Sequence, residues 1–220
     1  NCDKDMVYVL ETILQQEVAS LWHKDTDLLG CDMIVLPGGF SYGDYLRSGA
    51  IARFSPIMEK VIDFANDGGY VFGVCNGFQI LCESGLLPGA LLHNLSHKFV
   101  CKNVYLSTQT IQSALTANLD KETPLSIPIA HGEGRYFADE ATLQSLNDND
   151  QILFRYCNQD GQQTDDANPN GALEHIAGIC NHKRNVFGMM PHPERAADSE
   201  LGNTDGRALF ESLISVMAQA

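Results

Sequence analysis

The chain has 220 residues, of which 44% are hydrophobic, and a formal net charge of −14 from 28 acidic and 14 basic side chains. This length fits one α/β domain with a full core, so we expect a single domain over residues 1–220. Nucleic acids and anionic membrane surfaces are excluded as partners, because no basic block exists to neutralise phosphates. Without a membrane-length apolar run or a charged-then-apolar leader, the expected location is the cytoplasm. The seven scattered cysteines lack a C-x-x-C pair and indicate reduced thiols.

The N-terminal third is predicted to contain a helix, two strands and a second helix. Apolar residues recur at helical spacing near the start of the chain, at Met6, Val9, Leu10, Ile13 and Leu14. Residues 17–23 are predicted to form a strand, and residues 31–36 form a continuous apolar strand of the kind found in parallel sheets. A helix is expected over residues 48–66.

A glycine-rich loop over residues 37–44 follows the second strand. It lacks the G-K-[ST] ending of a phosphate-binding loop, so we do not predict a nucleotide site. Glycines at the carboxyl end of a parallel strand lie on the edge where α/β proteins bind their ligands. The exposed N–H groups of Gly38 and Gly39 are therefore candidate anion donors, although a plain tight turn is the alternative.

The most informative stretch is an apolar strand over residues 70–74 that ends at Cys75. Gly73 and Gly77 flank this cysteine, and an apolar-periodic helix follows from Phe78. The spacing G-x-C-x-G is the thiol version of the nucleophile elbow, a sharp strand-to-helix turn that holds the nucleophile in a strained conformation. A helix N-terminus behind the sulfur favours the reactive thiolate. A buried, inert cysteine in a strand-to-helix connection remains the alternative at this point.

The middle of the chain reads as further strands joined by polar loops. Strands are predicted over residues 100–106, 126–131 and 151–157, a polar helix or loop over 142–150, and exposed turns over 159–171. Gly132 and Gly134 flank Glu133, which suggests that the backbone approaches a ligand closely there. His93 and His97 have the spacing of a metal-binding pair, but no third ligand is evident and we predict no metal site.

The C-terminal segment offers a base for the thiol. Short strands are predicted over residues 177–180 and 186–190, followed by Pro191-His192-Pro193-Glu194 and a final amphipathic helix over 205–217. The prolines stiffen the backbone around His192, and Glu194 can set its tautomer. If strand 186–190 is parallel to strand 70–74, then Cys75, His192 and Glu194 form a thiol triad at one edge of the sheet. A rigid surface loop is the alternative for this motif alone.

Together, these motifs resemble the class I glutamine amidotransferases and, more narrowly, the glutaminase subunits of phosphoribosylformylglycinamidine synthase. The stretches that carry the likeness are residues 36–44, 73–79, 130–136, 168–171, 190–195 and 205–212. The resemblance covers nearly the whole chain. It implies an α/β fold with an open, mainly parallel, flavodoxin-like sheet flanked by helices, with extra antiparallel strands.

The resemblance also implies residue roles. Cys75 would be the nucleophile, His192 the general base and acid, and Glu194 the group that orients His192. Backbone N–H groups of Gly39 and Asn76 would form the oxyanion hole. The amino-acid end of the substrate would be held near Gly38, Gln79, Gly132 and Glu133.

The implied reaction is hydrolysis of L-glutamine to glutamate and ammonia through a glutamyl thioester. The ammonia would pass to a synthetase subunit that converts formylglycinamide ribonucleotide with ATP and Mg²⁺, alongside a small accessory subunit; this chain itself would need no cofactor. The family opens with a strand before Asn1-Cys2-Asp3, so we expect the first strand to be missing here. The alternatives are a glutaminase of another pathway, a cysteine peptidase and a redox-sensing protein on the same fold.

Overall fold

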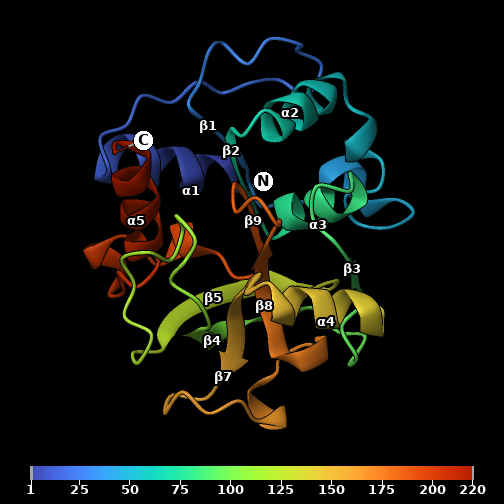
Figure 1. Cartoon of the computed structure of the whole chain (residues 1–220), viewed down its shortest axis with the longest axis vertical. Helices are drawn as coiled ribbons and strands as arrows, with labels where there is room; N and C mark the ends of the chain where they lie inside the picture. The colour runs from blue at the N-terminus through green and yellow to red at the C-terminus, as the bar shows by residue number, and fades with distance from the viewer. Residues whose placement is uncertain (1, 220) are drawn as a thin grey trace.

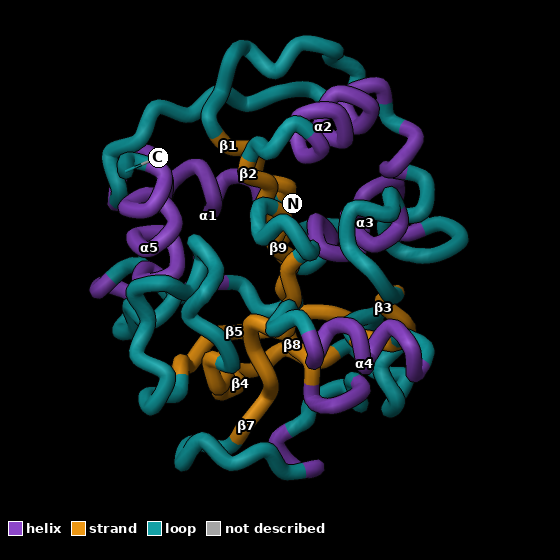
Figure 2. Tube along the Cα trace, viewed as in Figure 1, coloured by secondary structure: helices purple, strands orange, loops and turns teal. Residues whose placement is uncertain are grey.

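The computed structural model describes residues 2–219 and contains a large mixed sheet, part of which lies between two groups of helices (Figures 1 and 2). Its strands are β1 (Met33–Leu36), β2 (Tyr70–Val74), β4 (Val100–Thr108), β5 (Leu125–His131), β7 (Ile152–Cys157), β8 (Ile176–Cys180) and β9 (Val186–Met189). A small second sheet pairs β3 (Ala90–Leu92) with β6 (Arg135–Phe137). The α-helices are α1 (Asp3–Tyr8), α2 (Pro56–Asn66), α3 (Asn76–Glu83), α4 (Glu140–Asp148) and α5 (Arg207–Met217).

Three neighbouring strands, β1, β2 and β9, run parallel and form the half of the sheet that carries the functional motifs. Leu36 pairs with Gly73, and Val74 pairs with Met189, so the three strands end at nearly the same level. Because parallel strands share one carboxyl edge, the segments that follow them meet there. The expected parallel pairing of the elbow strand with the C-terminal strand is confirmed.

The other half of the sheet is antiparallel, with β8, β7, β4 and β5 following β9 in that order. The α/β class with flanking helices is confirmed, but the sheet is mixed rather than mainly parallel. The reason lies in the connections: β8 and β9 are joined by the short turn 181–185, and a short turn can join only antiparallel neighbours. Figure 1 shows this half below the parallel strands, with α4 beside it.

Helices cover both faces of the parallel strands, with α2 and α3 on one side and α1 and α5 on the other (Figure 1). Every residue of β9 is buried, as expected for a strand covered on both faces. On the α5 side, the ring of Phe72 from β2 meets Phe210 from α5 at a centroid distance of 6.0 Å. This packing holds the elbow strand between two helical layers.

Two predictions from the N-terminal third are wrong in detail. Residues 17–23 form no strand, because Trp22 is 61% exposed and the segment has no continuous apolar face to bury against a neighbour. The helix expected over residues 48–66 begins only at Pro56, which occupies its first turn, where a missing N–H costs nothing. Residues 52–54 before it form a short 3₁₀ turn.

In the described part of the chain, no helix combines the length and the apolar character that crossing a bilayer requires.

Candidate active site

Cys75 occupies a strained turn between β2 and α3. Its backbone adopts φ 51° and ψ −104°, a conformation that non-glycine residues rarely adopt. The Cys75 N–H donates to the carbonyl of Met189 over 2.8 Å, which fastens the turn to the end of β9. The sulfur therefore lies at the carboxyl edge of the parallel strands, directly before the N-terminus of α3. This is the geometry that the G-x-C-x-G spacing predicts.

The two flanking glycines are needed because neighbouring backbone comes close on both sides of the turn. A Cβ on Gly77 would collide with the main-chain carbonyl of Leu36 at the end of β1. A Cβ on Gly73 would lie 2.7 Å from the carbonyl carbon of Gly77. Both contacts involve backbone atoms, which have no rotamer to change. The glycines thus let β1, the elbow and α3 pack at close quarters.

His192 and Glu194 form a buried pair in the loop after β9. Nδ1 of His192 donates to Oε1 of Glu194 over 2.6 Å, and the two side chains are 2% and 0% exposed. The backbone N–H of His192 also donates to the carbonyl of Pro128 over 2.8 Å, so β5 holds the loop in place. The carboxylate fixes the imidazole tautomer and leaves Nε2 as the reactive nitrogen.

The electrostatic surroundings of His192 favour its protonated form. Burial by itself lowers the pKa of His192, but hydrogen bonding with Cys2, Cys75 and Glu194 and the Glu194 charge outweigh burial and raise it. Nδ1 of His192 is occupied by Glu194, and Nε2 is buried without a hydrogen-bond partner among the described residues, which leaves Nε2 available for proton transfer. The Cys75 thiol itself donates to the carbonyl of Ala130 over 3.9 Å. The arrangement is a nucleophilic thiol beside an oriented imidazole.

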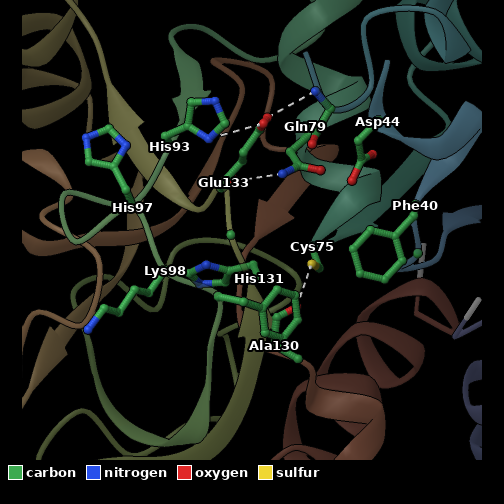
Figure 3. A pocket seen from close by; sticks show the side chains of 14 residues that line it. Phe40, Asp44, Cys75, Gln79, His93, His97, Lys98, Ala130, His131 and Glu133 are labelled. Carbon is green, nitrogen blue, oxygen red and sulfur yellow. Dashed lines mark hydrogen bonds and ion pairs between the residues drawn. The ribbon is translucent and has the colours of Figure 1, made fainter. Parts of the chain in front are cut away.

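A cavity of about 200 Å³ opens beside the Cys75 sulfur (Figure 3). Five of the predicted site residues line it: Gly39, Cys75, Gln79, Gly132 and Glu133. The other lining residues, which the sequence motifs did not assign to the site, are Phe40, Asp44, Ser48, His93, His97, Lys98, Phe99, Ala130 and His131. The cavity thus joins the glycine-rich loop, the elbow and the loop after β5.

Carboxylates and cations both face this cavity. Glu133 accepts a hydrogen bond from the backbone N–H of Ser48 over 3.1 Å and lies 3.3 Å from Nδ1 of His93. Oδ1 of Asp44 is buried without a partner, and burial, together with the Glu133 charge, raises the pKa of Asp44. Two carboxylates in a cavity of this size suit the ammonium group of an amino acid.

Gln79 takes part in a hydrogen-bond chain across the cavity wall. Its Nε2 donates to the carbonyl of Glu133 over 2.6 Å, and its Oε1 accepts from Nδ2 of Asn76 over 2.8 Å. Oδ1 of Asn76 in turn accepts from the backbone N–H of Ser41 over 3.1 Å. The chain links three segments that are distant in sequence, so Gln79 positions the loop around Glu133 as well as lining the cavity.

Four predicted residues lie behind the cavity rather than on its surface: Gly38, Asn76, His192 and Glu194. For Gly38 the reason is steric. A Cβ there would lie 2.6 Å from Cε1 of His192, so Gly38 packs against the imidazole. The substrate contact predicted for Gly38 stays a prediction, and the structure adds a packing contact with His192.

Sequence motifs also missed Asn94, which shapes the loop after β5. Its side chain accepts from Nδ1 of His131 (3.2 Å) and the Gly134 N–H (3.1 Å), and donates to the carbonyls of His131 and Lys98 (2.9 Å each). Nothing in the sequence around Asn94 indicates this role, because His131 and Gly134 are about 40 residues away along the chain. Burial and the nearby His192 charge lower the pKa of His131 to about 4, so its ring is neutral near pH 7.

A thiol on a strained elbow, an imidazole oriented by a carboxylate and a polar cavity at the edge of an α/β sheet define a thiol-dependent hydrolase of the glutamine amidotransferase class. Comparison with known proteins agrees. The chain matches the model of the CobB/CobQ-like glutamine amidotransferase domain over residues 1–208. The chain belongs to this family and, within it, to the glutaminase subunits of phosphoribosylformylglycinamidine synthase.

The narrower assignment rests on full-length relatives. The chain is 57% identical over 219 residues to phosphoribosylformylglycinamidine synthase subunit PurQ of Koribacter versatilis, covering 100% of this chain and 95% of that protein. Subunit PurQ of Synechocystis is also 57% identical, over 96% of this chain and 95% of that protein. The solved structure of PurLQS from Thermotoga maritima matches with a TM-score of 0.86 and 41% identity, over 99% of this chain and 93% of that one.

Proposed function

We propose that Cys75, His192 and Glu194 carry out the glutaminase reaction of this subunit. The Cys75 sulfur attacks the side-chain amide carbon of L-glutamine, and the thiol proton resides on Nε2 of His192. As the C–N bond breaks, His192 passes this proton to the leaving amine, which departs as ammonia. Water then attacks the glutamyl thioester while His192 accepts its proton, and glutamate and the thiol are restored. The single observation that carries the proposal is the buried 2.6 Å pair of His192 and Glu194 at the sheet edge that holds Cys75.

The tetrahedral intermediates require donors for a developing oxyanion. We assign this role to the backbone N–H groups of Gly39 and Asn76. Gly39 lines the cavity beside Cys75, and Asn76 is the first residue of α3, where helix N–H groups have no intrahelical partner. Each such donor contributes on the order of 3 kcal/mol of transition-state stabilisation.

The amino-acid end of glutamine is assigned to the far side of the cavity. Gln79, the backbone near Gly132 and the carboxylates of Glu133 and Asp44 lie there. The carboxylates pair with the α-ammonium group, while backbone N–H groups of the loop face the α-carboxylate. The cavity volume of about 200 Å³ accommodates one free amino acid.

The ammonia is used by a synthetase subunit in purine biosynthesis. Support for a docking surface comes from large exposed apolar side chains in segments that line the cavity or adjoin its lining. Tyr45 and Leu46, which follow the lining residue Asp44, are 74% and 91% exposed, and the lining residue Phe99 is 54% exposed. Exposed apolar side chains that gather in this way mark an interaction surface. A synthetase docked here would enclose the cavity and receive ammonia before it reaches solvent.

We also propose that this chain needs no cofactor and no metal, and that ATP and Mg²⁺ act on the synthetase subunit. Each glutaminase step moves one proton among a thiol, an imidazole, an amine and water, which the triad can do alone. A small accessory subunit as a third component of the assembly is supported by the three letters L, Q and S in the name PurLQS of the Thermotoga relative. The reduced state of all seven cysteines fits a cytoplasmic location.

The test is ammonia release from glutamine, measured with the chain alone and with the synthetase subunits. The Cys75→Ala variant should abolish glutamine-dependent synthesis by the assembled enzyme, whereas synthesis from added ammonium salt continues. Glutamine-dependent synthesis that survives in Cys75→Ala would contradict the proposed nucleophile. Equal rates of ammonia release with and without the synthetase would contradict activation by the partner.

A further inference from the structure

Cys2 contacts two segments of the active site that are far apart in sequence. Its backbone N–H donates to the carbonyl of Gly38 over 3.1 Å, directly before the oxyanion-hole residue Gly39. Its sulfur accepts a hydrogen bond from Nη2 of Arg195 over 2.8 Å, directly after Glu194. One residue thus joins the turn that follows β1 to the loop that carries the catalytic base.

The Cys2 sulfur also lies against the catalytic imidazole. The sulfur, a ring nitrogen of His192 and a carboxylate oxygen of Glu194 all lie within 4.8 Å of one another. Gly38 closes this contact, because a Cβ at that position would lie 2.6 Å from Cε1 of His192 and 3.3 Å from the Cys2 sulfur. The imidazole is therefore confined by Glu194, the Cys2 sulfur and the Gly38 backbone.

A metal ion is the obvious alternative for a cysteine, a histidine and a glutamate in such proximity. Two observations argue against it. The Arg195 guanidinium lies 2.8 Å from the sulfur, and a positive charge at this distance opposes the binding of a second cation. In addition, Nδ1 of His192 and Oε1 of Glu194 are already committed to each other at 2.6 Å. The cluster of Cys2, His192 and Glu194 therefore holds side chains in place and is not a metal site.

Helix α1 anchors Cys2 independently of the triad. Nε of Arg195 lies 3.3 Å from Oδ2 of Asp5, and the Tyr8 hydroxyl donates to Oδ2 of Asp198 over 2.8 Å. The start of the described chain is therefore fastened to the loop after His192 at three points: Cys2, Asp5 and Tyr8. Of these, Cys2 alone approaches the imidazole, which separates its role from general anchoring of the helix.

We propose that Cys2 is a positioning residue of the glutaminase site: held by Arg195, its thiol fixes the His192 imidazole and, through Gly38, the oxyanion turn relative to Cys75. This inference rests on the proposed function. It assigns to Cys2 no bond to substrate and no covalent step. Because the thiol contacts the base, its removal should change catalysis more than substrate binding.

The pH–rate profile reports the ionisation of His192, and replacing a residue that only stabilises the fold would not change this profile. The titratable or charged groups that surround His192 are Cys2, Cys75, His131, Glu194 and Arg195. Hydrogen bonding with Cys2 is one of the interactions that raise the pKa of His192 against the effect of burial. Removing the Cys2 thiol should therefore shift the limb of the pH–rate profile that reports His192 toward lower pH.

The experiment compares Cys2→Ala and Cys2→Ser with the matched control Tyr8→Phe, which removes another anchor of the same helix. Glutamine kinetics from about pH 6 to 11, a range that extends to alkaline pH because the pKa of His192 is raised, and thermal unfolding are measured in the complex with the synthetase. Cys2→Ala should lower kcat roughly ten- to hundred-fold, the range expected when a catalytic group is displaced by about 1 Å, with KM changed less than about twofold. Cys2→Ser still accepts from Arg195 and should recover most of kcat, whereas Tyr8→Phe should lower Tm and leave kcat and the pH profile unchanged.

A kcat and pH profile of Cys2→Ala equal to those of Tyr8→Phe would overturn the inference. If Cys2→Ala does not fold, Arg195→Gln carries the test, because it keeps the thiol but removes its donor; it should show the same loss of kcat, and an unchanged kcat would overturn the inference. The variant Cys75→Ser tests the proposed function separately from the role of Cys2. If Cys75→Ser retained glutaminase activity, the proposed function would fail rather than the role of Cys2.

Discussion

Nδ1 of His192 and Oε1 of Glu194 are 2.6 Å apart inside the protein, and neither side chain is exposed by more than 2%. A carboxylate this close and this well shielded from water controls both the tautomer and the charge of the imidazole. The second oxygen of Glu194 is buried without a partner, so its charge is compensated mainly by His192. The pair therefore acts as a unit, and its loss should impair catalysis more than it lowers stability.

Glu194→Gln should lower kcat for glutamine hydrolysis by roughly 10³–10⁴-fold, because a neutral amide cannot stabilise the imidazolium or enforce its tautomer. Ammonia-dependent synthesis by the assembled enzyme should remain within about twofold of the parent, since it bypasses the triad. Steady-state assays with both nitrogen donors check this. Parallel losses with both donors would point to a folding defect instead.

The neutral, buried imidazole of His131 makes stability depend on pH. Burial, reinforced by the His192 charge, lowers its pKa from 6.5 to about 4, so the unfolded chain binds more protons between these values. The free energy of unfolding should therefore fall as the pH drops from about 6.5 to about 4, by up to roughly 3 kcal/mol from this residue.

Urea unfolding of the parent, His131→Gln and the exposed control His182→Gln at several pH values between 4 and 7 checks the contribution. His131→Gln should flatten the pH dependence, and His182→Gln should not change it. If the unfolding free energy of His131→Gln depends on pH as it does in the parent, groups other than His131 cause the acid sensitivity.

Gly77→Ala should destabilise the protein by about 3 kcal/mol or more, because the new methyl group would meet the backbone carbonyl of Leu36 and force β1 away from the elbow. Gly132→Ala is the matched control. The nearest atom to a Cβ at Gly132 is Cδ2 of Phe99 at 3.9 Å, so its stability should stay within about 0.5 kcal/mol of the parent. Chemical denaturation of both variants gives the comparison, and equal stability would refute the steric argument.

Gln79→Ala should raise KM for glutamine about tenfold, because the carbonyl of Glu133 and the amide of Asn76 lose their partner and the cavity wall loosens. An unsatisfied buried polar group costs roughly 1–3 kcal/mol, which bounds the accompanying loss of stability. Gln144→Ala on the exposed side of α4 serves as a surface control. KM is measured by varying the glutamine concentration with both variants. An unchanged KM in Gln79→Ala would show that Gln79 has a purely structural role.

Local motifs were the part of this site that sequence patterns predicted well. The elbow strand ends at Val74 as expected, since an apolar run, two glycines and a following helix all constrain the same few residues. His192 lies between two prolines and Glu194 is two residues further on, so their contact depends mainly on local backbone. Motif resemblance then predicted the family, which the comparisons confirm.

Long-range arrangement was predicted less well. Composition predicts a strand over residues 17–23, but in the structure this segment forms no strand and pairs with none of the sheet. The observed sheet contains more antiparallel pairs than the sequence predicts, because an apolar run indicates that a strand is buried but not in which direction it runs. Cys2 and Arg195 are 193 residues apart, and no spacing rule relates them.

By itself, the sequence determined which side chains carry the chemistry: a thiol on an elbow and a histidine followed by its carboxylate, each specified by residues that are neighbours along the chain. Only the tertiary structure decided how these two motifs meet and what surrounds them. The parallel register of β1, β2 and β9 brings Gly39, Cys75 and His192 to one edge. The Cys2 contact and the acidic cavity wall follow from that packing, because they join segments whose approach depends on the whole fold.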